Sequence, residues 1–246
     1  MTKITASEVN NLRKISGAGI MDCKNALVEA NGDTEAAIEI LRKKGQKVAA
    51  KRADRESSEG AAIAKVSSDN SSGVIISLNC ETDFVAKNES FVSLANELAE
   101  LAISHETLDD FLKCQIDSMT VSEKLIQQTG VIGEKLVIGN FEKVSAGYVG
   151  KYIHAGNKIA TLVGFSKSVE GIEEASKNVA MQAAAMNPIA LDEDGVDQKT
   201  IEKEIEIAKD QLRQEGKPEA MLDNIAKGKL KRFFKDNTLV NQAYIK

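Results

Sequence analysis

The hydrophobic pattern of this chain has the period of helices at both ends and the period of β-strands only in the middle. Residues 5–45 form three helical segments, with glycine-containing breaks between them. Between residues 60 and 186, two runs of alternating apolar residues are each followed by a helical segment. The remainder is helical again. This order predicts an α+β fold with a helical module at each end.

The N-terminal segment predicts a compact three-helix bundle. Thr5 and Glu8 have the spacing of a capping box, which begins the first helix. The second helix is expected over residues 20–30 and the third over residues 33–45, where Gly45 stops it. Residues 46–59 are expected to form a basic and then polar linker.

The middle of the chain predicts two units in which a hairpin precedes a helix. Strands are expected at residues 62–66, 74–80, 134–144, 148–154 and 158–165, and helices at residues 89–104, after the Thr120–Glu123 capping box, and at 172–186. The two units resemble each other. Two explanations are open. Either the second unit is a duplicate of the first, or the likeness is only that of any hairpin followed by a helix.

The last helical region predicts a short antiparallel coiled-coil hairpin. Its apolar positions step by three and four residues along two arms, namely Ile201, Ile205, Ala208 and Leu212, then Met221, Ile225 and Gly228. Residues 215–218 turn the chain between the arms.

Composition narrows the class of protein. The chain has 246 residues, of which 42% are hydrophobic and 28% charged, as in soluble globular proteins of two or three modules. No apolar run is long enough to span a bilayer, and the first residues lack a signal-peptide core. We therefore expect a cytoplasmic protein without membrane contact.

The sequence shows no pattern typical of an enzyme. It contains no phosphate-binding loop, dinucleotide fingerprint or nucleophile elbow. Three widely spaced cysteines and two histidines exclude a histidine-rich metal site and suggest neither a zinc site nor a disulfide framework. We therefore expect a binding protein with no catalytic residues, no metal, no cofactor and no small-molecule substrate.

One basic stretch, residues 43–55, allows an alternative function. It interrupts a chain whose net charge is −5. A nucleic-acid-binding protein usually shows a basic domain or stripe. The stretch is either a solvated linker or the contact surface of a nucleic-acid-associated binding module.

The segment Asn79–Ala86 (NCETDFVA) connects a predicted strand to a helix. By strand parity, Phe84 shares the face of Val74, Ile76 and Cys80, which makes it a core residue. Alternatively, the segment is an exposed loop that presents Phe84 and Asp83 to a partner, because recognition residues tend to lie on loops. His154, at the second hairpin turn, is either a bystander or a partner contact.

Four segments in order along the chain resemble signatures of the elongation factor Ts family. They are residues 12–24 (LRKISGAGIMDCK), residues 79–86 (NCETDFVA), residues 152–159 (YIHAGNKI) and residues 229–234 (KLKRFF). Each is far more specific than a lone glycine pattern, and together they span essentially the whole chain.

The resemblance implies an architecture. It consists of an N-terminal three-helix module like a ubiquitin-associated (UBA) domain, a core of two related α+β subdomains with antiparallel sheets, and an inserted coiled-coil hairpin. Mapped here, the module and its linker span residues 1–55 and the first subdomain residues 56–146. The second subdomain spans residues 147–187 with 229–246, and the hairpin spans residues 188–228.

The resemblance also implies a function, which is nucleotide exchange on elongation factor Tu, with no direct nucleic-acid contact. In the family, the motif that matches Thr82, Asp83, Phe84 and Val85 inserts beside the magnesium and guanine-nucleotide site of that partner. Phe84 would be the apolar wedge, and Asp83 would help to displace the elements that hold magnesium. Further partner contacts would come from Leu12, Arg13, Ile20, Met21 and His154. Ile20 departs from the methionine often expected there, but an apolar contact survives that change.

Overall fold

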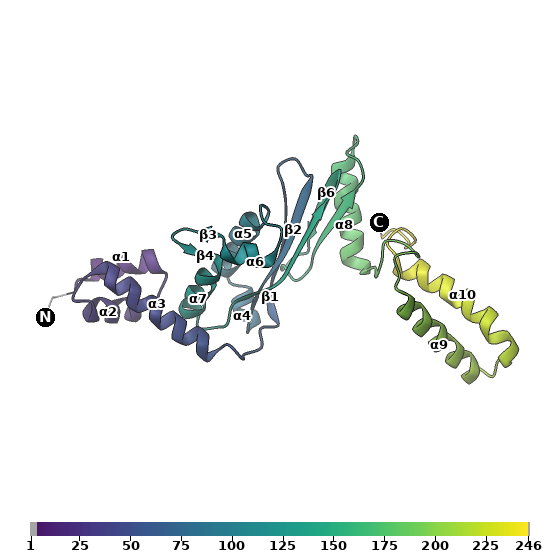
Figure 1. Cartoon of the computed structure of the whole chain (residues 1–246), viewed down its shortest axis with the longest axis horizontal. Coiled ribbons are helices and arrows are strands. Elements are labelled where there is room, and N and C mark those ends of the chain that lie inside the picture. The colour runs from purple at the N-terminus through teal and green to yellow at the C-terminus, as the bar shows by residue number, and fades with distance from the viewer. Residues whose placement is uncertain (1–3, 246) are drawn as a thin grey trace. The chain divides into compact units, whose positions relative to one another are not determined.

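The computed structural model describes residues 4–245 and divides into two compact units, one ending at Ser168 and one beginning at Val169 (Figure 1). The first unit contains α1 (Ala6–Ser16), α2 (Ile20–Glu29), α3 (Thr34–Lys51), β1 (Glu59–Val66), β2 (Ser72–Cys80), α4 (Asp83–Ala86), α5 (Glu89–Ala102), α6 (Leu108–Lys113), β3 (Gln115–Ile116), β4 (Met119–Thr120), α7 (Val121–Ile132), β5 (Val137–Ser145), β6 (Tyr148–Ile153) and β7 (Ala160–Phe165). The second contains α8 (Ile172–Met186), α9 (Gln198–Gln214) and α10 (Glu219–Asn237). Helices combined with small antiparallel sheets confirm the predicted α+β class.

Helices α1, α2 and α3 share a small apolar core, which includes Leu12 and Leu27. The first helix begins at the predicted capping box, where the Thr5 N–H donates to Glu8 Oε2 (2.7 Å) and the Glu8 N–H donates to Thr5 Oγ1 (3.3 Å). It ends at Gly17, whose φ of 68° lies in the left-handed region that favours glycine. The three helices predicted for this segment are therefore present.

The prediction that the third helix stops at Gly45 is wrong, because α3 continues to Lys51. Gly45 is buried inside α3, where this helix contacts α7. A Cβ added to Gly130 of α7 would lie 2.5 Å from the Cα of Gly45. The absence of a side chain at Gly130 allows the two helix backbones to touch at Gly45. Part of the expected linker is therefore helix.

One antiparallel sheet contains β1, β2 and β5, with β2 in the centre. Val74, Ile76, Leu78 and Cys80 of β2 are buried, as strand parity predicts. Helix α5 contacts β1 and β2, and its Phe91 and five other apolar residues are buried in the same core. This core fixes the end of β2, from which the Asn79–Ala86 segment leaves the sheet.

A second sheet, the hairpin of β6 and β7, lies against the first. The Ala62 N–H donates to the Asn157 carbonyl (2.8 Å), and the Val149 N–H donates to the Asn70 carbonyl (2.7 Å). The hairpin thus belongs to the same compact unit as β1, β2 and β5, whereas α8 belongs to the other. The expected subdomain boundaries do not coincide with these units, and they stay a prediction.

Helices α9 and α10 form a hairpin whose arms are joined by ion pairs such as Lys209–Asp223 (2.5 Å). The outward arm buries Ala208 and Leu212, as expected. The return arm buries Leu222 and Ala226, one residue later than predicted, and leaves Met221 exposed. The predicted and the observed buried positions are both spaced by about one helical turn. A shift of one residue turns the buried face of the helix by about 100°. None of the helices described over residues 4–245 is long and apolar enough to cross a membrane.

Candidate partner-binding site

Phe84 is the most exposed large apolar side chain among the described residues, with 84% of its surface accessible. The chain leaves β2 at Cys80 and enters the short helix α4 at Asp83. Within α4, Ala86 is buried, and Val85 is half-buried against the core. Successive helical residues point about 100° apart, so anchoring these two residues inward turns Phe84 outward. The core position that parity suggested for Phe84 is wrong, because the strand ends before it.

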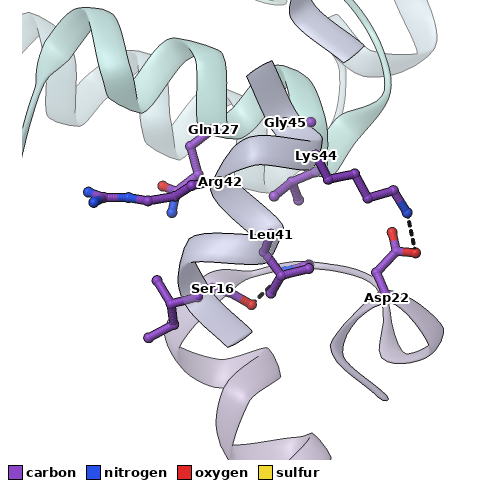
Figure 2. A pocket seen from close by; sticks show the side chains of 11 residues that line it. Ser16, Asp22, Leu41, Arg42, Lys44, Gly45 and Gln127 are labelled. Carbon is purple, nitrogen blue, oxygen red and sulfur yellow. Dashed lines mark hydrogen bonds and ion pairs between the residues drawn. The ribbon is translucent and has the colours of Figure 1, made fainter. Parts of the chain in front are cut away.

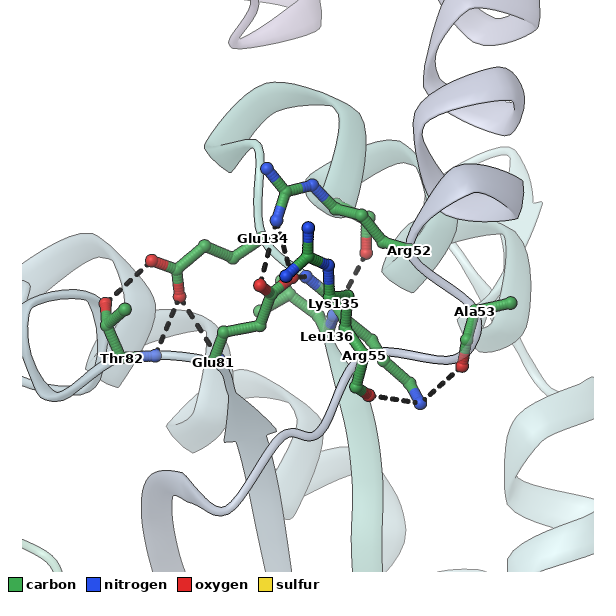
Figure 3. Close-up of polar contacts among 9 residues, drawn as sticks. Arg52, Ala53, Arg55, Glu81, Thr82, Glu134, Lys135 and Leu136 are labelled. Atoms are coloured by element: carbon green, nitrogen blue, oxygen red, sulfur yellow. Dashed lines mark hydrogen bonds and ion pairs between the residues drawn. The ribbon is translucent and has the colours of Figure 1, made fainter.

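The segment from Glu81 to Ala86, called the Phe84 loop below, is held by a carboxylate from the end of α7 (Figure 3). Glu134 Oε1 accepts the Thr82 hydroxyl (2.7 Å), and Glu134 Oε2 accepts the N–H groups of Thr82 (3.0 Å) and Glu81 (3.2 Å). The Thr82 hydroxyl also caps α4 by accepting the Val85 N–H (3.4 Å). Thr82 therefore supports the loop, while Phe84 projects from it.

A second carboxylate connects the same loop to the end of α3. The two oxygens of Glu81 accept from Arg52 Nη1 at 2.7 and 2.9 Å, and Oε1 also accepts the Lys135 N–H at 2.7 Å. The Lys135 ammonium donates to the carbonyls of Ala53 (2.8 Å) and Arg55 (3.0 Å). The chain after α3 is thus bonded to the base of the Phe84 loop (Figure 3).

Asp83 forms an ion pair with Lys87, one helical turn later, at 2.6 Å. The hydrogen bond and positive charge of Lys87 hold the pKa of Asp83 below its ordinary value. Both side chains are substantially exposed. Asp83 is therefore a negatively charged group beside Phe84. Because its ion pair with Lys87 is exposed, a positively charged group on a partner can replace Lys87.

The turn of the β6–β7 hairpin lies at the same end of the sheet as the Phe84 loop. Lys158 of this turn pairs with Glu59, which lies opposite Cys80 in the β1–β2 register. His154 is exposed there, and its Nδ1 lies 2.9 Å from the Tyr152 hydroxyl. The structure thus places His154 and the Phe84 loop on one edge of the first unit.

The N-terminal module exposes three of its four predicted contact residues. Ile20 and Met21 are 51% and 60% exposed and line a groove of about 310 Å³ that also includes Ile4 and Val9. Arg13 is exposed on α1. Leu12 is fully buried in the module core, so it supports this surface and is not part of it.

Comparison with known proteins assigns the chain to a family. A protein-family model described as "Elongation factor TS" matches residues 81–246. A protein named "Elongation factor Ts" from Christiangramia forsetii is 70% identical over 246 residues, which cover 100% of this chain and 90% of the relative. The chain belongs to the elongation factor Ts family. Relatives of the same name from Flavobacterium psychrophilum and Porphyromonas gingivalis are 67% and 42% identical, cover 100% and 99% of this chain, and are themselves covered over 90% and 88%.

Membership of the elongation factor Ts family gives the chain a role in translation elongation.

A hollow between α1, α3 and α7 has room for about one water molecule, with a volume of about 30 Å³ (Figure 2). Lys44 and Asp22 form an ion pair beside it at 2.5 Å. Among residues 4–245, no group of three or more His, Cys, Asp and Glu side chains could hold a metal ion. The Phe84 loop is the candidate site for this family role, because it presents an exposed apolar side chain on a backbone that hydrogen bonds hold in place.

Three of the six basic side chains of residues 43–55 have acidic partners. Lys43 pairs with Glu39 (2.8 Å), Lys44 with Asp22 (2.5 Å) and Arg52 with Glu81 (2.7 Å). These acidic partners neutralise charges that a phosphate backbone would otherwise attract. Lys47, Lys51 and Arg55 are exposed, so the alternative of a nucleic-acid-associated binding module stays a prediction.

Glu81 should make the stability of the first unit depend on pH. Bonds from the Lys135 N–H and from Arg52 lower its pKa below the ordinary value of 4.5. Because the folded pKa lies below the unfolded one, the stabilisation is present above the unfolded pKa and is lost as pH falls through the folded pKa. We expect the difference in urea midpoint between the natural chain and Glu81→Gln to shrink as pH falls from about 7 through the acid range. A difference that stays constant over that range would contradict this role.

Three residues of the site were missed by sequence reasoning. Glu134 and Lys135 were assigned only to the start of a strand, and Arg52 only to a solvated linker. Their partners in the Phe84 loop lie 29 to 54 residues away in the chain. The only available signal was the pair of adjacent polar residues Glu81 and Thr82 after a buried strand, whose N–H groups needed an acceptor.

Proposed function

We propose that this chain is a guanine-nucleotide exchange factor that binds elongation factor Tu and promotes GDP release by disturbing the magnesium and nucleotide site of that partner. The observation that supports this most directly is Phe84, which is 84% exposed on a loop whose base is held by three hydrogen bonds to Glu134. An exposed aromatic side chain on a supported loop is suited to fill an apolar pocket in a partner.

The residues of the loop have separate roles in this proposal. Phe84 enters between elements of elongation factor Tu, and Asp83 places a negative charge beside the groups that hold magnesium. Magnesium neutralises phosphate charge, so disturbing its site weakens nucleotide binding. Thr82 and Val85 keep α4 in place through the cap and the contact with the core.

Two further surfaces complete the proposed interface. Arg13, Ile20 and Met21 bind the partner from the N-terminal module, where Ile20 and Met21 line the apolar groove. His154 binds it from the edge that it shares with the Phe84 loop. Several separated contacts make affinity depend on more than one residue, while the effect on the nucleotide is assigned to the loop.

Exchange of this kind is a linkage effect and not a catalysed chemical reaction. The factor must bind elongation factor Tu more tightly in a state that holds GDP poorly. Reciprocity then requires GDP to weaken binding of the factor, which allows the cycle to turn over. The proposal involves no cofactor, no membrane and no direct nucleic-acid contact, and it places the protein in the cytoplasm with the translation machinery.

The proposed function is tested by the release of a fluorescent GDP from purified elongation factor Tu, with and without this chain. We expect acceleration of about a thousandfold at saturating factor, equivalent to a barrier lowered by about 4 kcal/mol. Raising magnesium should oppose the effect, because the ion stabilises bound nucleotide. Release that is unchanged by the chain at every concentration would refute the proposal.

A further inference from the structure

Glu134 accepts three hydrogen bonds from the start of the Phe84 loop. Its carboxylate accepts two N–H groups and one hydroxyl, from Glu81 and Thr82, residues 52 or 53 positions away in the chain. No other carboxylate described over residues 4–245 accepts bonds from the N–H groups of two consecutive residues of this loop.

The position of Glu134 is set by the end of α7. This helix ends at Gly133, whose φ is 81° and whose N–H donates to the Thr129 carbonyl (2.9 Å). The Thr129 hydroxyl in turn accepts the Leu136 N–H (3.1 Å), and Thr129 is buried. Residues on both sides of Glu134 are thus fixed to the last turn of α7, so its carboxylate has a defined place.

The bonds to Glu134 also determine how Thr82 caps α4. The Thr82 hydroxyl donates a hydrogen bond to Glu134, and its oxygen accepts one from the Val85 N–H. A hydroxyl held in this way fixes the first turn of α4 and with it the direction of the next two side chains. Phe84 makes no buried contact of its own that could do so, since it is 84% exposed.

We infer that Glu134 is a positioning residue for exchange, which holds Phe84 in the conformation that enters the partner; this rests on the proposed function. Without Glu134 the loop must become ordered during binding. The entropy lost in that ordering offsets part of the favourable free energy of the contacts with the partner. Glu134 acts through the loop and need not touch elongation factor Tu.

The first test compares Glu134→Ala with Glu134→Gln in the fluorescent GDP assay. We expect Glu134→Ala to lower the maximal acceleration at least about tenfold, because it removes a charged acceptor from three donors. Glu134→Gln retains one acceptor oxygen and should lose less. Adding Phe84→Ala to Glu134→Ala should cost less than Phe84→Ala costs in the natural chain, because the two residues act in series. Full additivity of the two changes would overturn the inference.

The matched control is Glu123→Ala at the other end of α7. Glu123 also accepts the N–H (2.8 Å) and hydroxyl (3.1 Å) of a threonine, Thr120, but it caps the helix far from the Phe84 loop in sequence. We expect this change to lower the urea midpoint while exchange stays within about twofold of the natural chain. An equal loss of exchange in both variants would assign the effect of Glu134→Ala to general destabilisation.

A second measurement needs no partner. Amide hydrogen exchange at Glu81 and Thr82 should become at least about tenfold faster in Glu134→Ala, because these N–H groups lose their acceptor. Unchanged protection would overturn the inference. If the natural chain fails to release GDP, the proposed function falls, yet amide exchange still decides whether Glu134 holds the loop. If the natural chain is active and Glu134→Ala is equally active, only the role of Glu134 falls.

Discussion

Phe84→Ala should lower the acceleration of GDP release by about 30-fold to 1000-fold, the equivalent of about 2–4 kcal/mol for a central aromatic contact. The folded state should be almost unchanged, because 84% of this side chain is exposed and it contributes little to the core. The free energy of unfolding should therefore stay within about 0.5 kcal/mol of the natural chain. Titration of the factor against fluorescent GDP release, together with urea unfolding, gives both quantities.

Met221→Ala is the matched control for Phe84→Ala. Met221 is also a large apolar side chain on a helix and is 52% exposed, but it lies in the second unit, on α10. We expect this variant to keep both exchange and stability. If Phe84→Ala unfolds the chain, or leaves exchange intact, the role of Phe84 as a wedge is refuted.

Gly130→Ala should destabilise the first unit by about 1–3 kcal/mol, as over-packing does in a closely packed contact. The new Cβ would lie 2.5 Å from the Gly45 Cα, and that neighbour is backbone, which cannot rotate away. Helices α3 and α7 must separate to admit the methyl group. The free energy of unfolding from urea titration, followed by circular dichroism, measures this loss.

Gly228→Ala separates this effect from helix propensity. Gly228 lies inside α10, and a Cβ there would meet nothing within 4 Å. Alanine is the better helix former by about 1 kcal/mol, so this control should be neutral or stabilising. Two variants that respond alike would show that α3 and α7 do not touch in solution as they do in the structure.

Structural features that depend on residues close together in the sequence could be predicted. Both capping boxes, Thr5 with Glu8 and Thr120 with Glu123, are present because donor and acceptor lie three residues apart. The buried face of β2 followed from its alternation. Membership of the family followed from motifs that are themselves local, and the sequence profile and relatives confirm it.

Features set by distant contacts could not be predicted. Helices commonly end at glycine, but Gly45 stays inside α3, where Gly130 of a separate helix packs against its backbone. Parity suggested that Phe84 is buried, but β2 ends at Cys80, and contacts with distant residues, including the bonds to Glu134 and the burial of Ala86, turn Phe84 outward. The return arm of the α9–α10 hairpin was placed one residue early because Met221 and Leu222 are adjacent apolar residues.

The contact between Gly45 and Gly130 also restricts how this sequence can diverge. A side chain added at Gly130 would press on the backbone of α3, 2.5 Å from the Gly45 Cα, whereas a Cβ added at Gly45 would meet only ordinary contacts at 3.5 Å or more. Replacement of Gly130 therefore requires further changes that move α3 as a whole, and an intermediate with the single change is expected to be less fit. A deep mutational library should therefore tolerate almost no replacement at Gly130, although the backbone that it approaches, at Gly45, lies 85 residues away in the chain.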